Sequence, residues 1–127
     1  MLLVSNTILA QSKTTITATV VNVSSDSGKV GFALYNKATF MKMPLQSLNA
    51  KIVDGKSTVT FKNIEAGEYA IVCLHDKNEN GKMDFSAQGR PEEDYGMSNN
   101  IMTMGPPNYE DAKFTITDKN VSLEIKF

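Results

Sequence analysis

Apolar and polar residues alternate with a period of two along most of the chain after residue 13. The clearest stretch is C-terminal, where the apolar positions are Val121, Leu123, Ile125 and Phe127. Such alternation predicts strands that bury one face. Similar patterns occur in segments 14–23, 29–35, 51–53, 57–62 and 112–117. With a continuous apolar run at 70–74, they predict an all-β protein of about seven strands.

Short polar segments with turn chemistry separate these strands. Asp118-Lys-Asn120 lies between the last two strands and Asp54-Gly55 between two central ones, so we expect a β-hairpin at each place. Segment 36–44 predicts a loop with one helical turn, and no long helix is expected. Short strands joined in this way favour a single antiparallel two-sheet β-sandwich of immunoglobulin-like form.

The run at 70–74 is apolar at successive positions, which predicts a central strand covered on both faces. From Asp76 to Asp111 the periodicity is lost, and glycine and proline are frequent. A connection of this length inside one domain is usually either functional or disordered. The long loop is therefore the first place to look for a site.

Directly after the apolar run, oxygen-bearing side chains occupy alternate positions and a glycine follows, in the order Asp76, Asn78, Asn80 and Gly81. Calcium-binding loops supply about six to eight oxygen ligands, many of them from alternate positions of a loop that bends sharply at its sixth residue. The pattern predicts a Ca²⁺ site, with the carbonyl of Lys82 and the carboxylate of Asp84 as further ligands.

The predicted loop departs from a complete EF-hand, because Ala87 occupies the twelfth position where a bidentate glutamate belongs. We expect Glu92, Glu93 or Asp94 to return across the loop and supply that carboxylate. The affinity for Ca²⁺ should then be weak, about 10⁻⁴–10⁻³ M. The alternative is that these Asp and Asn residues form ordinary turns through side-chain to backbone hydrogen bonds.

Length, charge and cysteine content exclude several classes of protein. With 127 residues the chain has room for one domain. A formal net charge of −1 provides no field that would attract nucleic acid. Cys73 is the single cysteine, so the chain can form neither an intrachain disulfide nor a thiolate cluster for zinc.

The first ten residues are apolar and end in Ala10, which predicts the remnant of a signal peptide, followed by one domain at 11–127. The positively charged start of a signal peptide is missing, so an apolar first strand is the alternative. No other segment approaches the roughly 18 apolar residues that would span a bilayer. We therefore expect an exported protein without a membrane span.

Two side-chain sets suggest other chemistry. Cys73 and His75 share a strand face, as a Cys-His nucleophile would, but a buried cysteine and a locally hydrogen-bonded histidine are commoner. Ser98 lacks the G-x-S-x-G context of a hydrolase nucleophile. We expect a protein that is not an enzyme, and a small hydrolase is the third hypothesis.

The chain contains seven methionines, and they include two Met-x-Met pairs, Met41/Met43 and Met102/Met104. Thioethers together with Cys73 and His75 would suit Cu(I), so a periplasmic copper-binding protein is the second hypothesis. The alternative is that these methionines fill irregular apolar gaps.

Aromatic rings, amides and hydroxyls gather near the predicted ion site, at Tyr95, Ser98, Asn99, Asn100 and Tyr109. This mixture suits a glycan or a peptide or protein ligand, because rings supply contact area and amides supply directed hydrogen bonds. It also suits a loop that packs on itself.

Three motifs and their continuation resemble the bacterial DUF2141 family, whose function is unknown. They are Phe61-x-x-Ile64-x-x-Gly67-x-Tyr69-Ala70-Ile71, His75-Asp76-x-Asn78-x-Asn80-Gly81-x-x-Asp84, Gly89-x-Pro91-x-x-x-Tyr95-Gly96-x-Ser98-Asn99-Asn100, and Gly105-Pro106-Pro107-x-Tyr109-x-Asp111-Ala112. The resemblance implies a bacterial protein that is periplasmic, at the outer surface or secreted. It also implies a prealbumin-like sandwich and no established activity.

Overall fold

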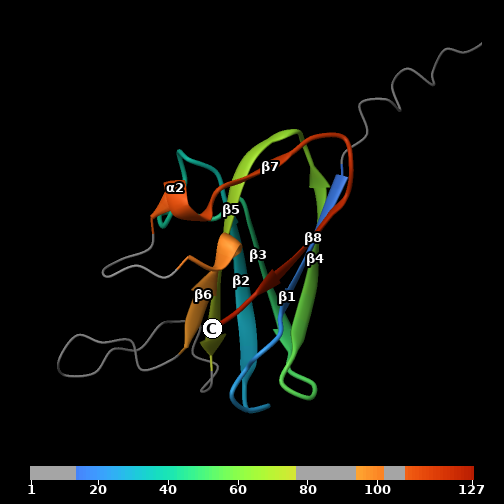
Figure 1. Cartoon of the computed structure of the whole chain (residues 1–127), viewed down its shortest axis with the longest axis vertical. Coiled ribbons are helices and arrows are strands. Elements are labelled where there is room, and N and C mark those ends of the chain that lie inside the picture. Colours follow the sequence, from blue (N-terminus) through green and yellow to red (C-terminus); the bar gives the residue numbers. More distant parts are fainter. Residues whose placement is uncertain (1–13, 77–93, 102–107) are drawn as a thin grey trace, which may run out of the picture.

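In a computed structural model of the chain, which describes residues 14–76, 94–101 and 108–127, two β-sheets pack face to face (Figure 1). The strands are β1 Thr14–Val20, β2 Lys29–Tyr35, β3 Gln46–Lys51, β4 Ser57–Ile64, β5 Gly67–Asp76, β6 Tyr95–Met97, β7 Phe114–Ile116 and β8 Val121–Ile125. Two short helical segments, η1 Ser98–Asn100 and α2 Tyr109–Ala112, accompany them. The predicted β-sandwich is confirmed.

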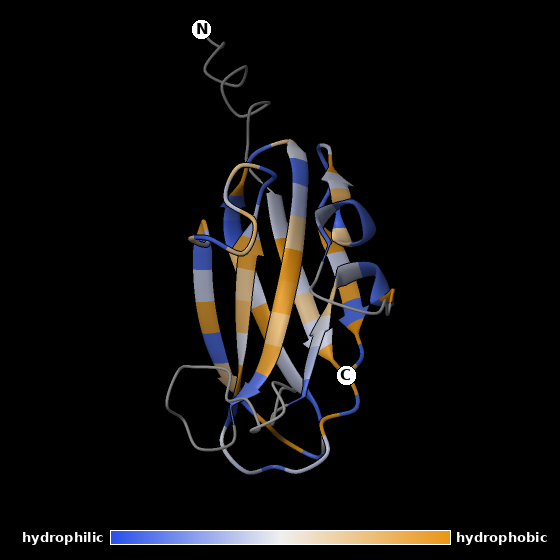
Figure 2. Ribbon diagram, turned by 90° about the vertical axis from the view of Figure 1, so that its left-hand side faces the viewer, coloured by the Kyte–Doolittle hydropathy of each residue, from blue (hydrophilic) through white to orange (hydrophobic). Residues whose placement is uncertain are grey.

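The smaller sheet has the strand order β4-β1-β8 and the larger has the order β3-β2-β5-β6, with β7 pairing with another part of β5. Neighbouring strands are antiparallel except β1 and β8, which run parallel. Figure 2 shows apolar residues gathered in the middle of the central strands, whereas the connections contain both apolar and polar residues. No helix in the described part of the chain is long and apolar enough to span a membrane.

The main core fills the space between the sheets. Its largest fully buried side chains include Phe32 of β2 and Phe61 of β4, and the burial pattern of β1 alternates strictly as the period of two requires. A second apolar cluster lies on the outer face of the larger sheet, under α2 and the β2–β3 connection, and contains Tyr35, Ala70, Val72, Met97, Tyr109 and Ala112. Because β5 contributes to both clusters, the prediction of a central strand covered on both faces is confirmed.

The hairpin predicted at 118–120 is wrong, and the one predicted at Asp54-Gly55 is limited to its turn. β7 pairs with β5 in the larger sheet and β8 pairs with β1 in the smaller one, so the turn at 117–120 crosses between the sheets. At Asp54-Gly55 the predicted turn forms, because Val53 and Lys56 exchange two backbone hydrogen bonds of 2.8 and 3.1 Å. The strands β3 and β4 on either side of it then continue in different sheets. Alternation shows which residues share a buried face, but it does not identify the neighbouring strand.

Candidate functional site

The predicted calcium loop begins and ends on neighbouring strands. Asp76 is the last residue of β5, and Asp94 directly precedes β6. The two strands are antiparallel with Leu74 opposite Tyr95, and the backbone N–H of His75 donates a hydrogen bond to the carbonyl of Asp94 at 2.9 Å. The ladder therefore returns the chain at Asp94 to the place where the loop starts.

Asp76 and Asp94 differ in their exposure to solvent. Asp76 is 2% exposed and lies on the outer face of the larger sheet, opposite Lys29 in the ladder. Asp94 is exposed, and its Oδ2 accepts a hydrogen bond from the Ser24 hydroxyl on the β1–β2 connection at 3.3 Å. If the Asp94 carboxylate binds a calcium ion, it must therefore either lose its hydrogen bond with Ser24 or contact Ser24 and the ion together.

The other predicted calcium ligands lie outside the described residues, namely Asn78, Asn80, Lys82, Asp84, Glu92 and Glu93. Within 14–76, 94–101 and 108–127, no group of three or more His, Cys, Asp or Glu residues is placed to hold a metal ion. Of the predicted set, the described residues include only Asp76 and Asp94, and the calcium site itself stays a prediction.

Cys73 and His75 face the interior of the sandwich and are fully buried. Burial raises the pKa of the Cys73 thiol far above its usual range, which opposes formation of the nucleophilic thiolate. The His75 ring stacks on Phe127 with its planes 3° apart, and its Nε2 lies 2.8 Å from the carbonyl oxygen of Ser27. The Nδ1 atom has no hydrogen-bond partner in the described part of the chain. These contacts attach the end of β5 to the β1–β2 connection.

The structure does not bring together the residues of the copper hypothesis that it describes. Met41 and Met43 lie on the β2–β3 connection, 49% and 74% exposed, whereas Cys73 and His75 are buried between the sheets. Met102 and Met104 lie outside the described residues.

Three residues of the predicted ligand surface hydrogen-bond to the protein's own backbone. The Ser98 hydroxyl is fully buried, accepts from the N–H of Ile71 and donates to the carbonyl of Ala112. The Asn99 amide donates to the carbonyls of Asp111 and Lys113. These contacts join η1 to β5 and α2.

Asn100 makes the corresponding contacts on the other side of η1. Its amide donates to the carbonyl of Glu124, and its Oδ1 accepts from the N–H of Lys126, both at the edge of β8. Asn99 and Asn100 have positive φ angles of 71° and 57°, a conformation that asparagine tolerates better than most residues. The Ser98-Asn-Asn100 motif thus ties together the elements at one side of the sandwich.

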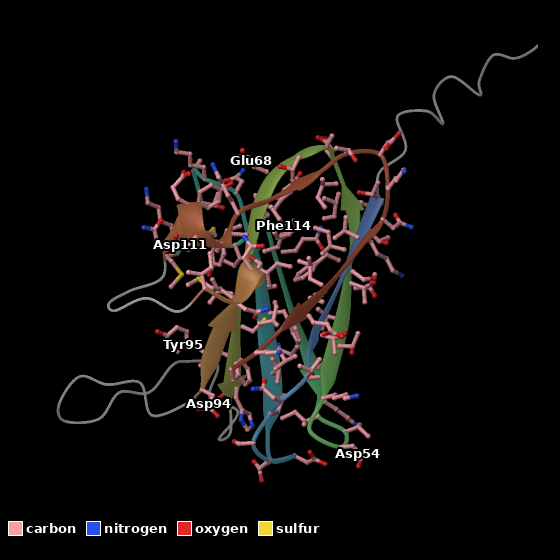
Figure 3. The ribbon with its side chains drawn as sticks, viewed as in Figure 1. Asp54, Glu68, Asp94, Tyr95, Asp111 and Phe114 are labelled. Carbon is pink, nitrogen blue, oxygen red and sulfur yellow. The ribbon has the colours of Figure 1, made fainter. Side chains whose placement is uncertain are left out.

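The two tyrosines of the predicted surface differ in their environment. Tyr109 is buried, and its ring meets Phe40 edge-on at 5.5 Å between centroids, while Phe40 meets Tyr35 in the same way at 5.6 Å. Burial and the nearby Glu68 carboxylate raise the pKa of Tyr109. Tyr95 is half-buried on β6, and Figure 3 shows it between Asp111 and Asp94 on the left-hand side of the molecule.

The Ser98→Ala variant should lose about 2 kcal/mol of its free energy of unfolding, because the N–H of Ile71 and the carbonyl of Ala112 would lose a buried partner. Ser122→Ala, at an exposed position of β8, is the matched control and should be neutral. Urea unfolding measures both. Equal stability of the two variants would show that the Ser98 hydroxyl has no structural role.

The outer face of the larger sheet carries a groove that sequence reasoning missed. It lies over β2, between β3 and β5, and has a volume of about 270 Å³. Its lining residues include Gly31 and Ala33 on β2, Ser47 and Asn49 on β3, and Val72 and Leu74 on β5, with Tyr35, Pro44 and Asp76 also contributing. The available signal was the pair of small residues at alternate positions 31 and 33, which share the outer face of β2.

Comparison with known proteins identifies the family. The family model described as "Uncharacterized protein conserved in bacteria (DUF2141)" matches residues 18–124. The chain belongs to the DUF2141 family. The match runs from β1 into β8, so it includes both sheets of the sandwich, and the resemblance predicted from the motifs is confirmed.

Other comparisons add little to the DUF2141 assignment. No curated protein matches the chain. Two structures of the pilus-presented adhesin Spy0125 (Cpa) are similar to it, one at 14% identity with a TM-score of 0.30, covering 93% of this chain and 28% of the adhesin. The other has 16% identity and a TM-score of 0.28, covering 90% and 26%. This chain therefore spans about a quarter of the length of these adhesin structures.

Proposed function

We propose that this DUF2141 protein is an exported, non-enzymatic β-sandwich module whose β5–β6 connection is organised by Ca²⁺. The observation that supports the proposal best is the β5–β6 ladder, which returns Asp94 beside the start of the oxygen-rich loop at Asp76. The ligands would be Asp76, Asn78, Asn80, the carbonyl of Lys82, Asp84, and a carboxylate of Glu93 or Asp94.

Burial of the Cys73 thiol and the His75 ring supports a non-enzymatic role, because a nucleophile and its base must reach a substrate. The apolar residues before Ala10 support export. In the periplasm, at the outer surface or outside the cell, millimolar Ca²⁺ would match the weak affinity expected of an incomplete loop. A module of this kind would serve binding or assembly, and the ion would stabilise its long connection.

The expected stabilisation follows from mass action. With a dissociation constant of about 10⁻⁴–10⁻³ M, Ca²⁺ at about 10 mM should add roughly 1–3 kcal/mol to the free energy of unfolding. For a domain of this size, that corresponds to a rise in melting temperature of about 5–10 °C. The full chain should therefore melt at a higher temperature in Ca²⁺ than in EDTA, and calorimetry should record heat on addition of Ca²⁺.

The matched variants are Asp84→Asn, inside the motif, and Asp118→Asn, at an exposed position on the β7–β8 connection. Each removes one negative charge while keeping the side-chain size. Asp84→Asn should abolish the difference between Ca²⁺ and EDTA, and Asp118→Asn should retain it. An unchanged melting temperature together with no heat from millimolar Ca²⁺ would refute the calcium proposal.

A further inference from the structure

Among the five described glycines, four have a structural reason to lack a side chain. Three have positive φ angles, a conformation that favours glycine, and they are Gly28 at 73°, Gly55 at 76° and Gly67 at 154°. A Cβ atom on the fourth, Gly96, would lie 2.5 Å from the backbone oxygen of Lys126. These four glycines serve the fold itself.

Gly31 has no such reason. It lies in the middle of β2, and the registers of β2 with both β3 and β5 continue through it without a bulge. An added Cβ would contact the exposed Asn49 side chain at 3.2 Å and nothing else within 4 Å. Glycine weakens a strand interior, and in an unbulged strand it often marks a place where a ligand approaches closely. Gly31 is at the bottom of the groove on the outer face.

The groove has a polar side and an apolar side. On the β3 side, the Ser47 hydroxyl and the Asn49 amide are exposed, and no hydrogen bond within the described part of the chain engages them. On the β5 side lie the aliphatic side chains of Val72 and Leu74, and Ala33 adds a methyl group on β2. A ligand that fits must therefore have hydrogen-bonding groups along one edge and C–H groups along another.

Two ligand classes fit this groove poorly. A peptide carries a dense row of backbone polar groups, but the backbone of β2 is already paired with β3 and β5 and offers none in return. The carboxylate of Asp76, which is 2% exposed, also lines one end of the groove, and without a bound cation its negative charge disfavours an anionic ligand. A neutral sugar ring avoids both problems, because it carries no charge and no row of backbone polar groups. Its hydroxyls that remain outside the groove stay in contact with water.

We infer that this groove binds one neutral pyranose ring of a glycan, with ring C–H groups on Ala33, Val72 and Leu74, and ring hydroxyls on Ser47 and Asn49. The volume of about 270 Å³ lies below the range of pockets that enclose drug-sized ligands, so a single ring fits and any further sugar units remain in solvent. The inference goes beyond the calcium proposal and does not require a bound ion.

The test is an amide NMR titration of the full chain, in Ca²⁺ and again in EDTA. The probes are methyl glucoside, methyl mannoside, methyl galactoside and N-acetylglucosamine at millimolar concentration, with glucuronate as the anionic comparison. In EDTA, at least one neutral pyranoside should shift the amide signals of β2 and β3 more than glucuronate does. The same shifts in EDTA would separate this inference from the calcium proposal.

Two variants locate the site. Gly31→Val should fill the groove and abolish the shifts, while its melting temperature is equal to or above that of the wild type because valine favours a strand. Asn49→Ala, which changes an exposed side chain, should weaken binding by about tenfold even if Gly31→Val fails to fold. The control is Thr58→Ala, at an exposed hydroxyl of β4 in the smaller sheet, and should bind normally.

Three results would each overturn the inference. They are the absence of shifts in β2 and β3 with every neutral pyranoside, binding that persists in both Gly31→Val and Asn49→Ala, and stronger binding of glucuronate than of the neutral sugars in EDTA. A peptide that occupied the groove in preference to the sugars would also contradict it.

Discussion

The Gly96→Ala variant is expected to lose about 3 kcal/mol of its free energy of unfolding, because an added methyl group has no space. A Cβ atom at Gly96 would lie 2.5 Å from the carbonyl oxygen of Lys126 and 3.1 Å from Cγ2 of Ile125. The carbonyl belongs to the backbone and cannot rotate away as a side chain would. β6 and the C-terminal segment would have to move apart, and urea unfolding measures the cost.

Gly31→Ala is the matched control for this experiment. Gly31 also lies in a strand with an ordinary φ angle, but its added Cβ would meet only the exposed Asn49 side chain, which can shift. We expect its stability to stay within about 0.5 kcal/mol of the wild type or to rise by up to about 1 kcal/mol. Equal losses at the two positions would contradict the close approach at Gly96.

The Phe61→Ala variant is expected to lose about 4 kcal/mol, the largest effect of a single side-chain truncation that we predict. Phe61 is fully buried in β4 and pairs with Ile16 of β1 on the inner face of the smaller sheet. Its removal takes away apolar burial and leaves a cavity that the two rigid sheets cannot close. The free energy of unfolding in urea gives the loss directly.

Thr60→Ala tests the same strand on its opposite face. Thr60 is exposed, and its hydroxyl lies 3.3 Å from that of Thr17 on β1. Because an exposed hydroxyl pair contributes little, the change should stay within about 0.5 kcal/mol. If Phe61→Ala were no more destabilising than Thr60→Ala, the assignment of Phe61 to the core would be wrong.

Local sequence pattern was sufficient for the features that depend on which face a residue occupies. The continuous apolar run at 70–74 predicted a strand covered on both sides, and β5 contributes to apolar clusters on both of its faces. The alternation at 121–127 likewise predicted β8. Burial follows directly from side-chain hydropathy and backbone period, and both can be read along the chain.

Contacts between residues that are distant in the sequence could not be predicted from the local pattern. The Asn99 amide meets the carbonyls of Asp111 and Lys113, and the Asn100 amide meets the edge of β8. From the sequence alone, these two asparagines could equally well have bound a ligand. An asparagine that binds a ligand and one that binds the protein's own backbone are the same residue in a sequence. The difference depends on which distant carbonyls lie within reach.

The sequence by itself determined the buried faces of most strands, the family, and the order of oxygen-bearing residues in the predicted calcium loop, but it missed β6 and placed β3 at 51–53. Only the tertiary structure decided that β8 lies parallel to β1, that β7 joins β5, and that Asp94 returns beside Asp76. It also showed that Gly31 opens a groove whereas Gly96 allows two segments to touch. The physical reason is that hydropathy acts residue by residue, while strand pairing and close approach are properties of segments that meet only in the folded chain.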